Sequence, residues 1–263
     1  MGPRLDRKSC FDISPAQKPF ANHNQAIAKD NSVDIQRATI AQLYKASIGL
    51  GDDFTFEYDP DAGSLRLHGT FVDTIQYASA PFPILRNMKD CIPILEQWKH
   101  IAASTLGPLS GPYLNSSDAL GNAFHRTLTA GIAYSSTSLE VPRRATATDV
   151  EGFASWLAHF TRLVKTGQLH DGSQHQIWAS ALRVAILDRV FFVTKQGYMG
   201  IMPAGARVGD AVYVLKKGNM PFAVRPLRGT EGRYRMIGAG FVAGMMDGEV
   251  VKQGGTMESL NFV

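Results

Sequence analysis

Cysteine is scarce in this sequence, and long apolar runs are absent. The 263 residues contain only Cys10 and Cys91, which are too few and too far apart for a framework of disulfides or for a paired-cysteine zinc site. No stretch approaches the roughly twenty apolar residues that a membrane-spanning helix needs. A basic but polar N-terminus does not match a secretory signal. We therefore expect free thiols, no membrane span and a cytoplasmic location.

Concentrated positive charge is also missing. The net charge is +4 and the isoelectric point is near 9.1, yet no run of Lys and Arg exceeds two residues. A nucleic-acid-binding protein usually gathers such charge on one face, among aromatic side chains, so we expect no nucleic-acid partner. The content of 44% hydrophobic and 19% charged residues is that of an ordinary globular protein with ample length for a core.

The motifs of common catalytic and cofactor sites are not found. Gly238, Gly240 and Gly244 form the nearest approach to a phosphate-binding loop, but they lie in an expected strand with no helix after it, which favours a packing role. His170 and His175 flank a glycine and are expected in a solvated loop rather than as metal ligands. No G-x-S-x-G or H-E-x-x-H word occurs. We expect neither a cofactor nor a metal.

Apolar residues at steps of three and four predict helices in the first two thirds of the chain. Pro93 is compatible with its helix only in the first turn, and Thr148 with Glu151 matches a capping box. The ranges with this periodicity are 33–44, 89–104, 117–132, 148–165 and 174–187.

Short alternating runs separated by glycine, proline and charged residues predict strands. One hairpin is expected around a turn at residues 59–63, and further strands are expected near 191–193, 199–201, 211–215, 221–224 and 234–242. The fold class is therefore α+β, with a β-hairpin and helical layer followed by a small C-terminal antiparallel β-barrel. We expect a flexible arm at 1–33, a hairpin and helical region at 34–187 and a barrel region at 188–263, packed together as one unit.

Five words in this last region occur in a fixed order. They are FFVTKQGYMGIMP, RVGD, PFAVRP, RYRMIG and FVAGMMDGE. In this order they resemble the C-terminal tail of fungal heterokaryon incompatibility proteins. The segment LYKASIGLGDDFTFEYDPDAGSLRLHGTFVDTI resembles the middle of the same family, so the resemblance covers about residues 40–263. Members of the family ordinarily begin with a death-inducing effector domain, and because little sequence precedes Phe54, we expect that domain to be absent.

Several positions match or depart from the family's words. Asp73, Asp210 and Arg225 match, and we expect them to satisfy buried backbone groups or to pair with one another. Ala239 and Ala243 stand where the family usually has Glu and His. His125 stands where the family tends to have Trp. Two accounts of these three departures stay open: neutral drift, or the opening of a cavity with a hydrogen-bond donor beside it.

The second account leads to a function. Stand-alone relatives of this tail resemble genes of fungal secondary metabolism, one of which, in the sordaricin diterpenoid pathway, is described as a norbornene-forming Diels-Alderase. The resemblance implies that an apolar terpenoid or polyene would be folded in a pocket and cyclised without a cofactor. Such a reaction needs no nucleophile or metal, only positioning and a donor on an activating carbonyl.

The candidate residues follow from this hypothesis. His125 and Arg126 are the candidate catalytic donors. The candidates for substrate binding are Trp98, Phe124, Trp156, Trp178, Arg225, Ala239 and Ala243. Each aromatic residue is of a type found more often in an ordinary core than in a pocket wall. The partners expected are therefore an apolar small molecule and, compatible with the sequence, a second copy of the chain.

A non-enzymatic protein-interaction module is the alternative. A family tail without its effector domain could act in self/non-self recognition by binding another protein. An apolar cavity between helices and barrel would favour ligand chemistry, whereas a filled core with an exposed apolar patch would favour a partner protein.

Overall fold

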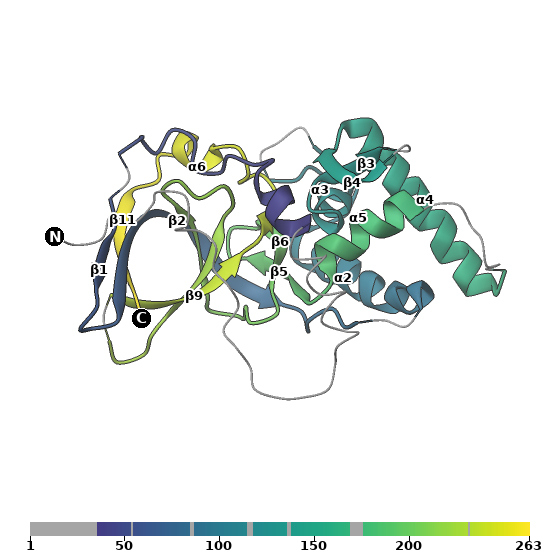
Figure 1. Cartoon of the computed structure of the whole chain (residues 1–263). Helices are drawn as coiled ribbons and strands as arrows, with labels where there is room; N and C mark the ends of the chain where they lie inside the picture. The colour runs from purple at the N-terminus through teal and green to yellow at the C-terminus, as the bar shows by residue number, and fades with distance from the viewer. Residues whose placement is uncertain are drawn as a thin grey trace, which may run out of the picture.

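A strand-rich end and a helical end make up the protein (Figure 1). The computed structural model describes residues 36–53, 55–84, 87–114, 118–135, 138–168, 176–230 and 232–263. The expected arm at 1–33 and the two histidines His170 and His175 lie outside these residues. The mixture of helices and strands confirms the α+β class.

The helices lie close to their predicted positions. Residues 36–41 are helical, and the further helices are η1 (Met88–Asp90), α2 (Cys91–Leu106), α3 (Leu120–Leu128), α4 (Ala147–Thr166), α5 (Gln176–Ile186) and the short α6 (Glu249–Lys252). Pro93 is the third residue of α2 and therefore lies in the first turn, where its missing N–H is tolerated. The periodicity of apolar residues thus located the five longer helical segments.

The capping box of α4 was predicted two residues too late. The N-cap is Thr146, whose side chain accepts a hydrogen bond from the backbone N–H of Asp149, while the Asp149 carboxylate accepts one from the backbone N–H of Thr146. Thr148 and Glu151 instead lie inside the helix. The Asp149 carboxylate also pairs with Arg143, which favours the nearer Thr-x-x-Asp box over the predicted Thr-x-x-Glu box.

Eleven strands accompany the helices in the described residues. They are β1 (Glu57–Asp59), β2 (Ser64–Ala78), β3 (Ile132–Ser135), β4 (Ser138–Arg144), β5 (Arg189–Thr194), β6 (Met199–Pro203), β7 (Ala211–Leu215), β8 (Phe222–Pro226), β9 (Arg233–Ala239), β10 (Phe241–Val242) and β11 (Met257–Phe262). The β3–β4 hairpin and β11 were not predicted.

The strand expected at residues 234–242 is divided by Gly240. A Cβ atom on Gly240 would lie 2.2 Å from the backbone oxygen of Ile201, so only glycine allows this close approach. Its N–H donates to the carbonyl of Pro221, outside the ladder. The chain therefore leaves β8 after β9 and pairs with β6 through β10. This confirms the packing role expected for the glycine.

Five strands curl around the interior of the strand-rich end. β2 pairs with β11, β11 with β9, β9 with β8, β8 with β7, and β7 pairs again with β2. All of these pairs are antiparallel except β11–β9, which is parallel. Three strands of the curl, β7, β8 and β9, belong to the predicted C-terminal set. β2 comes from residues before 188 and β11 was not predicted, whereas the strands predicted at 191–193 and 199–201 lie outside the curl. The C-terminal part of β2 pairs with β5, and the sheet extends from β5 through β6 to β10 on the side of the helices.

Aromatic side chains fill the space between β5 and the helices. The rings of Trp98 and Phe191 stack with centroids 5.6 Å apart, and the edge of Phe124 meets Phe191 at 5.9 Å. All three side chains are at most 1% exposed. The interior of the five-strand curl is a second apolar cluster, which includes Leu67, Tyr213 and Phe262. Both clusters are packed cores rather than channels.

Two buried aspartates anchor loops of the sheet. Asp210 is 1% exposed and receives hydrogen bonds from the Arg225 guanidinium at 2.7 Å and 2.9 Å, and from the backbone N–H of Arg207. Asp73 accepts the backbone N–H groups of Gln196 and of its own neighbour. The expectation that these family-matching residues satisfy backbone or one another is confirmed.

Removal of the Asp210 carboxylate should destabilise the protein strongly. Asp210→Ala leaves the Arg225 guanidinium, whose side chain is only 16% exposed, without its counter-charge. We expect a loss of about 3 kcal/mol in the free energy of unfolding, measured by urea denaturation. Glu57→Ala breaks the exposed pair with Arg66 and serves as the control, with an expected loss below about 1 kcal/mol. Equal losses in the two variants would contradict a stabilising role specific to the buried pair.

Candidate functional site

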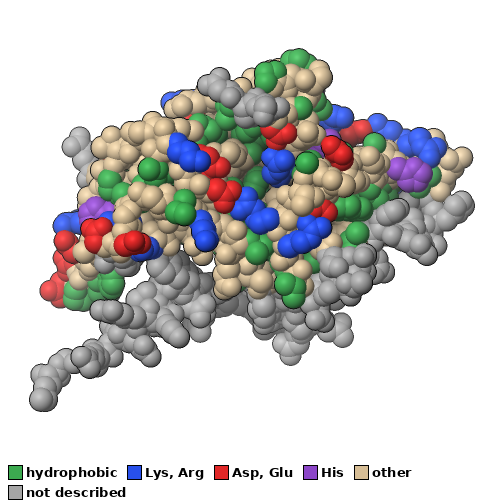
Figure 2. Space-filling view, turned by 90° about the horizontal axis from the view of Figure 1, so that it is seen from above, with side chains coloured by type: hydrophobic (Ala, Val, Ile, Leu, Met, Phe, Trp, Pro, Cys, Tyr) green, Lys and Arg blue, Asp and Glu red, His purple; other side chains and the backbone are tan. Residues whose placement is uncertain are grey.

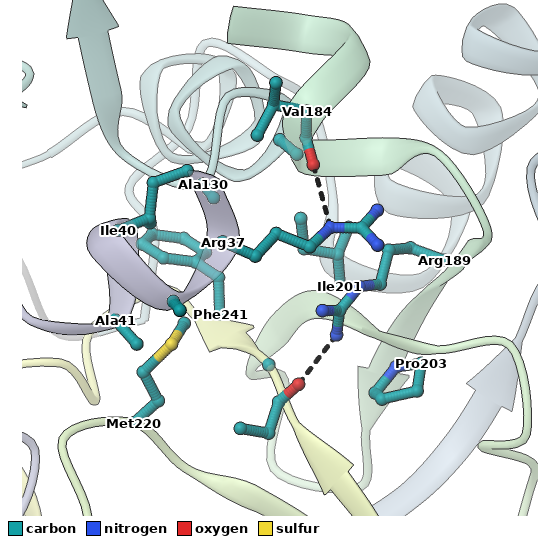
Figure 3. A pocket seen from close by; sticks show the side chains of 14 residues that line it. Arg37, Ile40, Ala41, Ala130, Val184, Arg189, Ile201, Pro203, Met220 and Phe241 are labelled. Atoms are coloured by element: carbon teal, nitrogen blue, oxygen red, sulfur yellow. Dashed lines mark hydrogen bonds between the residues drawn. The ribbon is translucent and has the colours of Figure 1, made fainter. Parts of the chain in front are cut away.

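A mostly apolar pocket lies where the helical and strand-rich ends meet (Figure 3). Its volume is about 260 Å³. The walls come from the helical residues 36–41, from α5, from the turn after α3 and from the sheet. Its apolar wall includes Ile40, Ala130, Val184, Ile201, Met220 and Phe241. We call it the Arg37–Arg189 pocket, after the two charged residues that line it.

Both arginines are held by backbone carbonyls. Arg37 Nε donates to the carbonyl of Val184 at 3.1 Å, and Arg37 Nη2 donates to that of Leu187. These carbonyls belong to the last turn of α5 and the residue after it, so the cation also meets the negative end of the helix dipole. Arg189 Nη1 donates to the carbonyl of Ala239 at 2.7 Å. Figure 3 shows both guanidinium groups on the same side of the pocket. They give an apolar cavity one strongly polar side.

A second, more polar pocket is lined by α3 and the segment before it, the turn before β6, the loop after β10, and α6 with the residue that follows it. Its volume is about 410 Å³, and its lining includes Asp118, Arg126, Tyr198, Ala243, Glu249 and Gln253. Arg126 forms an ion pair with Asp118 at 2.6 Å. The hydroxyl of Tyr198 donates to the side-chain oxygen of Gln253 at 3.2 Å. The charged and polar groups of this pocket largely bind one another.

His125 lines neither of these two pockets. Its ring lies between Phe124 and Phe153, with centroids 5.8 Å and 6.2 Å away. Nδ1 is buried and has no hydrogen-bond partner among the described residues. Burial, with a smaller contribution from the positive charge of Lys99, lowers the pKa of His125 to about 4. The imidazole is therefore neutral at pH 7, in an aromatic contact between α3 and α4.

The predicted aromatic wall is a packed core. Trp98 and Phe124 belong to the stacked group around Phe191. Trp156 is 7% exposed and stacks on Phe160, while Trp178 meets Phe153 edge to face. None of these four candidates lines either of the two pockets.

The remaining candidates are divided among three places. Ala239 lines the Arg37–Arg189 pocket, whereas Arg126 and Ala243 line the second pocket. Arg225 binds Asp210 in the sheet. The three positions that depart from the family, His125, Ala239 and Ala243, are thus not brought together in either pocket.

Arg37 and Arg189 were not predicted as site residues. Arg189 is the first residue of β5, directly before an apolar run, and a lone cation at that place was the available signal. Arg37 lies in a short helical segment far from α5 in sequence, so its contact with the end of α5 could not be read from spacing.

The described residues contain no group of three or more His, Cys, Asp or Glu side chains arranged to hold a metal ion. Among the helices in the same part of the chain, none is both long and apolar enough to cross a membrane. The free thiol of Cys91 is buried at the start of α2, and burial raises its pKa to about 12, which makes it a poor nucleophile.

Comparison with known families bears on the strand-rich end. Residues 159–260 match the Het-6 beta-barrel domain. The match begins inside α4 and ends in β11, so the Het-6 barrel region contains Arg189, Ala239 and the five resembling words. It confirms the resemblance to heterokaryon incompatibility proteins for this part of the chain. β2, which completes the curl, lies outside the matched residues.

A curated relative supports the same assignment. The chain is 35% identical over 60 residues to heterokaryon incompatibility protein 6, OR allele, of Neurospora crassa. The matched segment covers 22% of this chain and 9% of that protein. The matched part thus spans about a tenth of the relative's length. No solved structure matches. These similarities support a heterokaryon incompatibility type of region and give no support to a relation with a Diels-Alderase.

The environment of His125 predicts a dependence of stability on pH. The folded-state pKa of about 4 lies below the ordinary value of 6.5, so the unfolded chain binds the proton more readily between these values. Stability should therefore fall as the pH drops from 6.5 to 4, by at most about 3 kcal/mol from this group.

His125→Phe tests this contribution, because it keeps the aromatic contact and removes the titration. We expect the free energy of unfolding of the variant to fall less steeply between pH 6.5 and 4 than that of the wild type, as measured by urea denaturation at several pH values. Both proteins contain the same carboxylates, so a difference between the two slopes comes from His125. Parallel curves would show that the imidazole is not desolvated.

Proposed function

We propose that the protein binds a small, largely apolar molecule in the Arg37–Arg189 pocket. The observation that carries this proposal is the composition of the pocket wall. Most of the wall consists of apolar side chains from separate elements, and two guanidinium groups lie together on one side of it. Ligand sites commonly combine an apolar lining with a few fixed polar groups. A volume of about 260 Å³ suits a compact ligand of terpenoid size.

The proposed chemistry is cofactor-free ring closure of a terpenoid or polyene. A Diels–Alder closure is an isomerisation in which no atom is added or lost. Holding the reacting ends together can contribute roughly 7–11 kcal/mol in favourable intramolecular reactions. A guanidinium N–H directed at a carbonyl oxygen would stabilise the charge that develops there. In this proposal Arg37 and Arg189 replace His125 and Arg126 as donors, because they line the apolar pocket.

Recognition of another protein is the second candidate function. The name of the Neurospora relative refers to heterokaryon incompatibility, and the Het-6 barrel region is the part of this chain that matches a known family. The aromatic core around Trp98, Phe124 and Phe191 is filled, which meets the first half of the criterion for this candidate; the second half is an exposed apolar patch. The two candidates are distinguished by ligand binding: the first requires a small molecule to bind in the Arg37–Arg189 pocket, and the second does not.

Filling the pocket from Ala239 should weaken ligand binding. Ala239→Leu places an isobutyl group at the pocket wall, and we expect the affinity for farnesol to fall by roughly tenfold or more, equivalent to about 1.4 kcal/mol, in isothermal titration calorimetry. Ala147→Leu, at the exposed first residue of α4, adds the same group far from the pocket and should leave binding unchanged. Failure of the wild type to bind farnesol, geraniol and their acids would overturn the proposal.

The chemistry has its own test. A linear trienone that closes slowly in water would be incubated with wild type, Ala239→Leu and His125→Phe, and the cyclic product followed by chromatography. We expect acceleration by the wild type and by His125→Phe, and none by Ala239→Leu. Binding without acceleration would leave the protein as a ligand-binding module and exclude the cyclase.

A further inference from the structure

One row of side chains crosses the outer face of four strands. The backbone register places Arg233 of β9 beside Asn261 of β11, Asn261 beside Arg66 of β2, and Arg66 beside Glu57 of β1. Directly paired residues point to the same side of a sheet. The next row, which contains Leu65 and the interior residues of β11 and β9, points the other way into the apolar cluster. The row from Arg233 to Glu57 is therefore on the outside.

This outer row lies in a shallow groove of about 450 Å³. Residues two positions along a strand face the same side, so the row is flanked by Arg235 on β9 and Asp59 on β1. We define the charged face as Arg233, Arg235, Asn261, Arg66, Glu57 and Asp59. One end of this face is basic and the other is acidic.

The basic end carries exposed arginines. Residues 225–235 contain four arginines and one glutamate. Arg225 stands directly opposite Arg235, and the buried Asp210 carboxylate neutralises Arg225 alone. Arg228, Arg233 and Arg235 are exposed and form no ion pair within the part of the chain that the structure describes. The Asp210 carboxylate thus offsets the repulsion between Arg225 and Arg235, and an anion docked here would neutralise Arg233 and Arg235.

The acidic end is complementary. Residues 52–61 contain five carboxylates and no Lys or Arg. Asp52, Asp53 and Glu57 pair with Lys217, Lys216 and Arg66 of the same molecule, which leaves Asp59 and Asp61 for a partner. Within the described residues, Asp59 accepts hydrogen bonds from the backbone N–H groups of its own turn, those of Asp61 and Ala62, and from no cation. Figure 2 shows acidic side chains gathered at the end of the molecule where Figure 1 draws β1.

The two ends cannot meet within one molecule. β9 and β1 are separated by β11 and β2, so three strand spacings of about 4.8 Å place Arg233 and Glu57 roughly 14 Å apart. That distance is far beyond an ion pair. A second copy related by a two-fold axis would place each basic end against the other's acidic end, because a two-fold interface is self-complementary.

We propose that the charged face is the interface of a homodimer. Each copy contributes guanidinium groups from β9 and carboxylates from the β1 hairpin, which form charge-assisted hydrogen bonds. A nucleic acid, a membrane or a purely acidic protein would be repelled by the acidic end, so a second copy fits this face best. Association should weaken as salt screens the charges. This proposal is independent of ligand binding.

Charge reversal tests the dimer. The first variant, Arg233→Glu with Arg235→Glu, makes both ends acidic, and the second variant, Asp59→Lys with Asp61→Lys, makes both ends basic. The masses would be measured by light scattering across a concentration series at low and high salt. We expect a dimer for the wild type at low salt, monomers for each variant alone, and a dimer again when the two variants are mixed in equal amounts.

The mixture is the decisive arm, because restored association requires contact between these two ends. Lys89→Glu with Lys252→Glu reverses the same amount of charge at exposed sites elsewhere and should leave the wild-type dimer intact. Asp61→Lys alone, which spares the turn contacts of Asp59, provides a second acidic-end variant if the double variant unfolds. A monomeric wild type under all conditions, dimers in either variant alone or a monomeric mixture would overturn the proposal.

Discussion

The path of β2 is the constraint on which the rest of the structure depends. Its fifteen residues pair with β1 and β11 near its start, with β7 in its middle and with β5 at its end. The register shifts between Phe71 and Asp73 and again between Ile75 and Tyr77, and such irregularities bend a strand and increase its twist. One strand therefore closes the curl and also carries the sheet onward to the helices.

The continuation of β2 fixes where the Arg37–Arg189 pocket forms. β5 and β6 extend from the far end of β2, and the helices cover them, so the pocket opens at the seam between the two ends of the molecule. Contacts of the nearby Arg144 also hold separate segments together. The Arg144 guanidinium lies 4.3 Å from the ring centroid of Tyr44 and forms two hydrogen bonds with Asp247, which ties the β3–β4 hairpin to the segment after β10. Rigid surroundings of this kind favour a preformed site.

Local features of the chain were predictable from sequence, whereas contacts between distant segments were not. The apolar periodicity of α2, α4 and α5, and the short apolar runs of β5 and β6, are local signals and located those elements. β11 carries a weak apolar pattern, with only Leu260 and Phe262 buried, and its pairing with β2 and β9 depends on segments far away in the chain. No periodicity contains that information.

The site shows the same limit. The departures at His125, Ala239 and Ala243 were visible as sequence differences, but their positions in space depend on how α3, β9 and the loop after β10 pack. Ala239 does line a pocket, while His125 is part of an aromatic contact. The Arg37–Arg189 pocket joins residues about 150 positions apart, through the hydrogen bonds of Arg37 to Val184 and Leu187. Only the fold could reveal this pairing.

The place of β11 has a consequence for biogenesis. It is inserted between β2 and β9, although it is the latest of the described strands along the chain. During synthesis the ribosome must release this segment before the two neighbours can be bridged, so until then both expose unpaired backbone edges that could recruit other strands. Association of these open edges with strands of other molecules is thus a route to aggregation before β11 is in place.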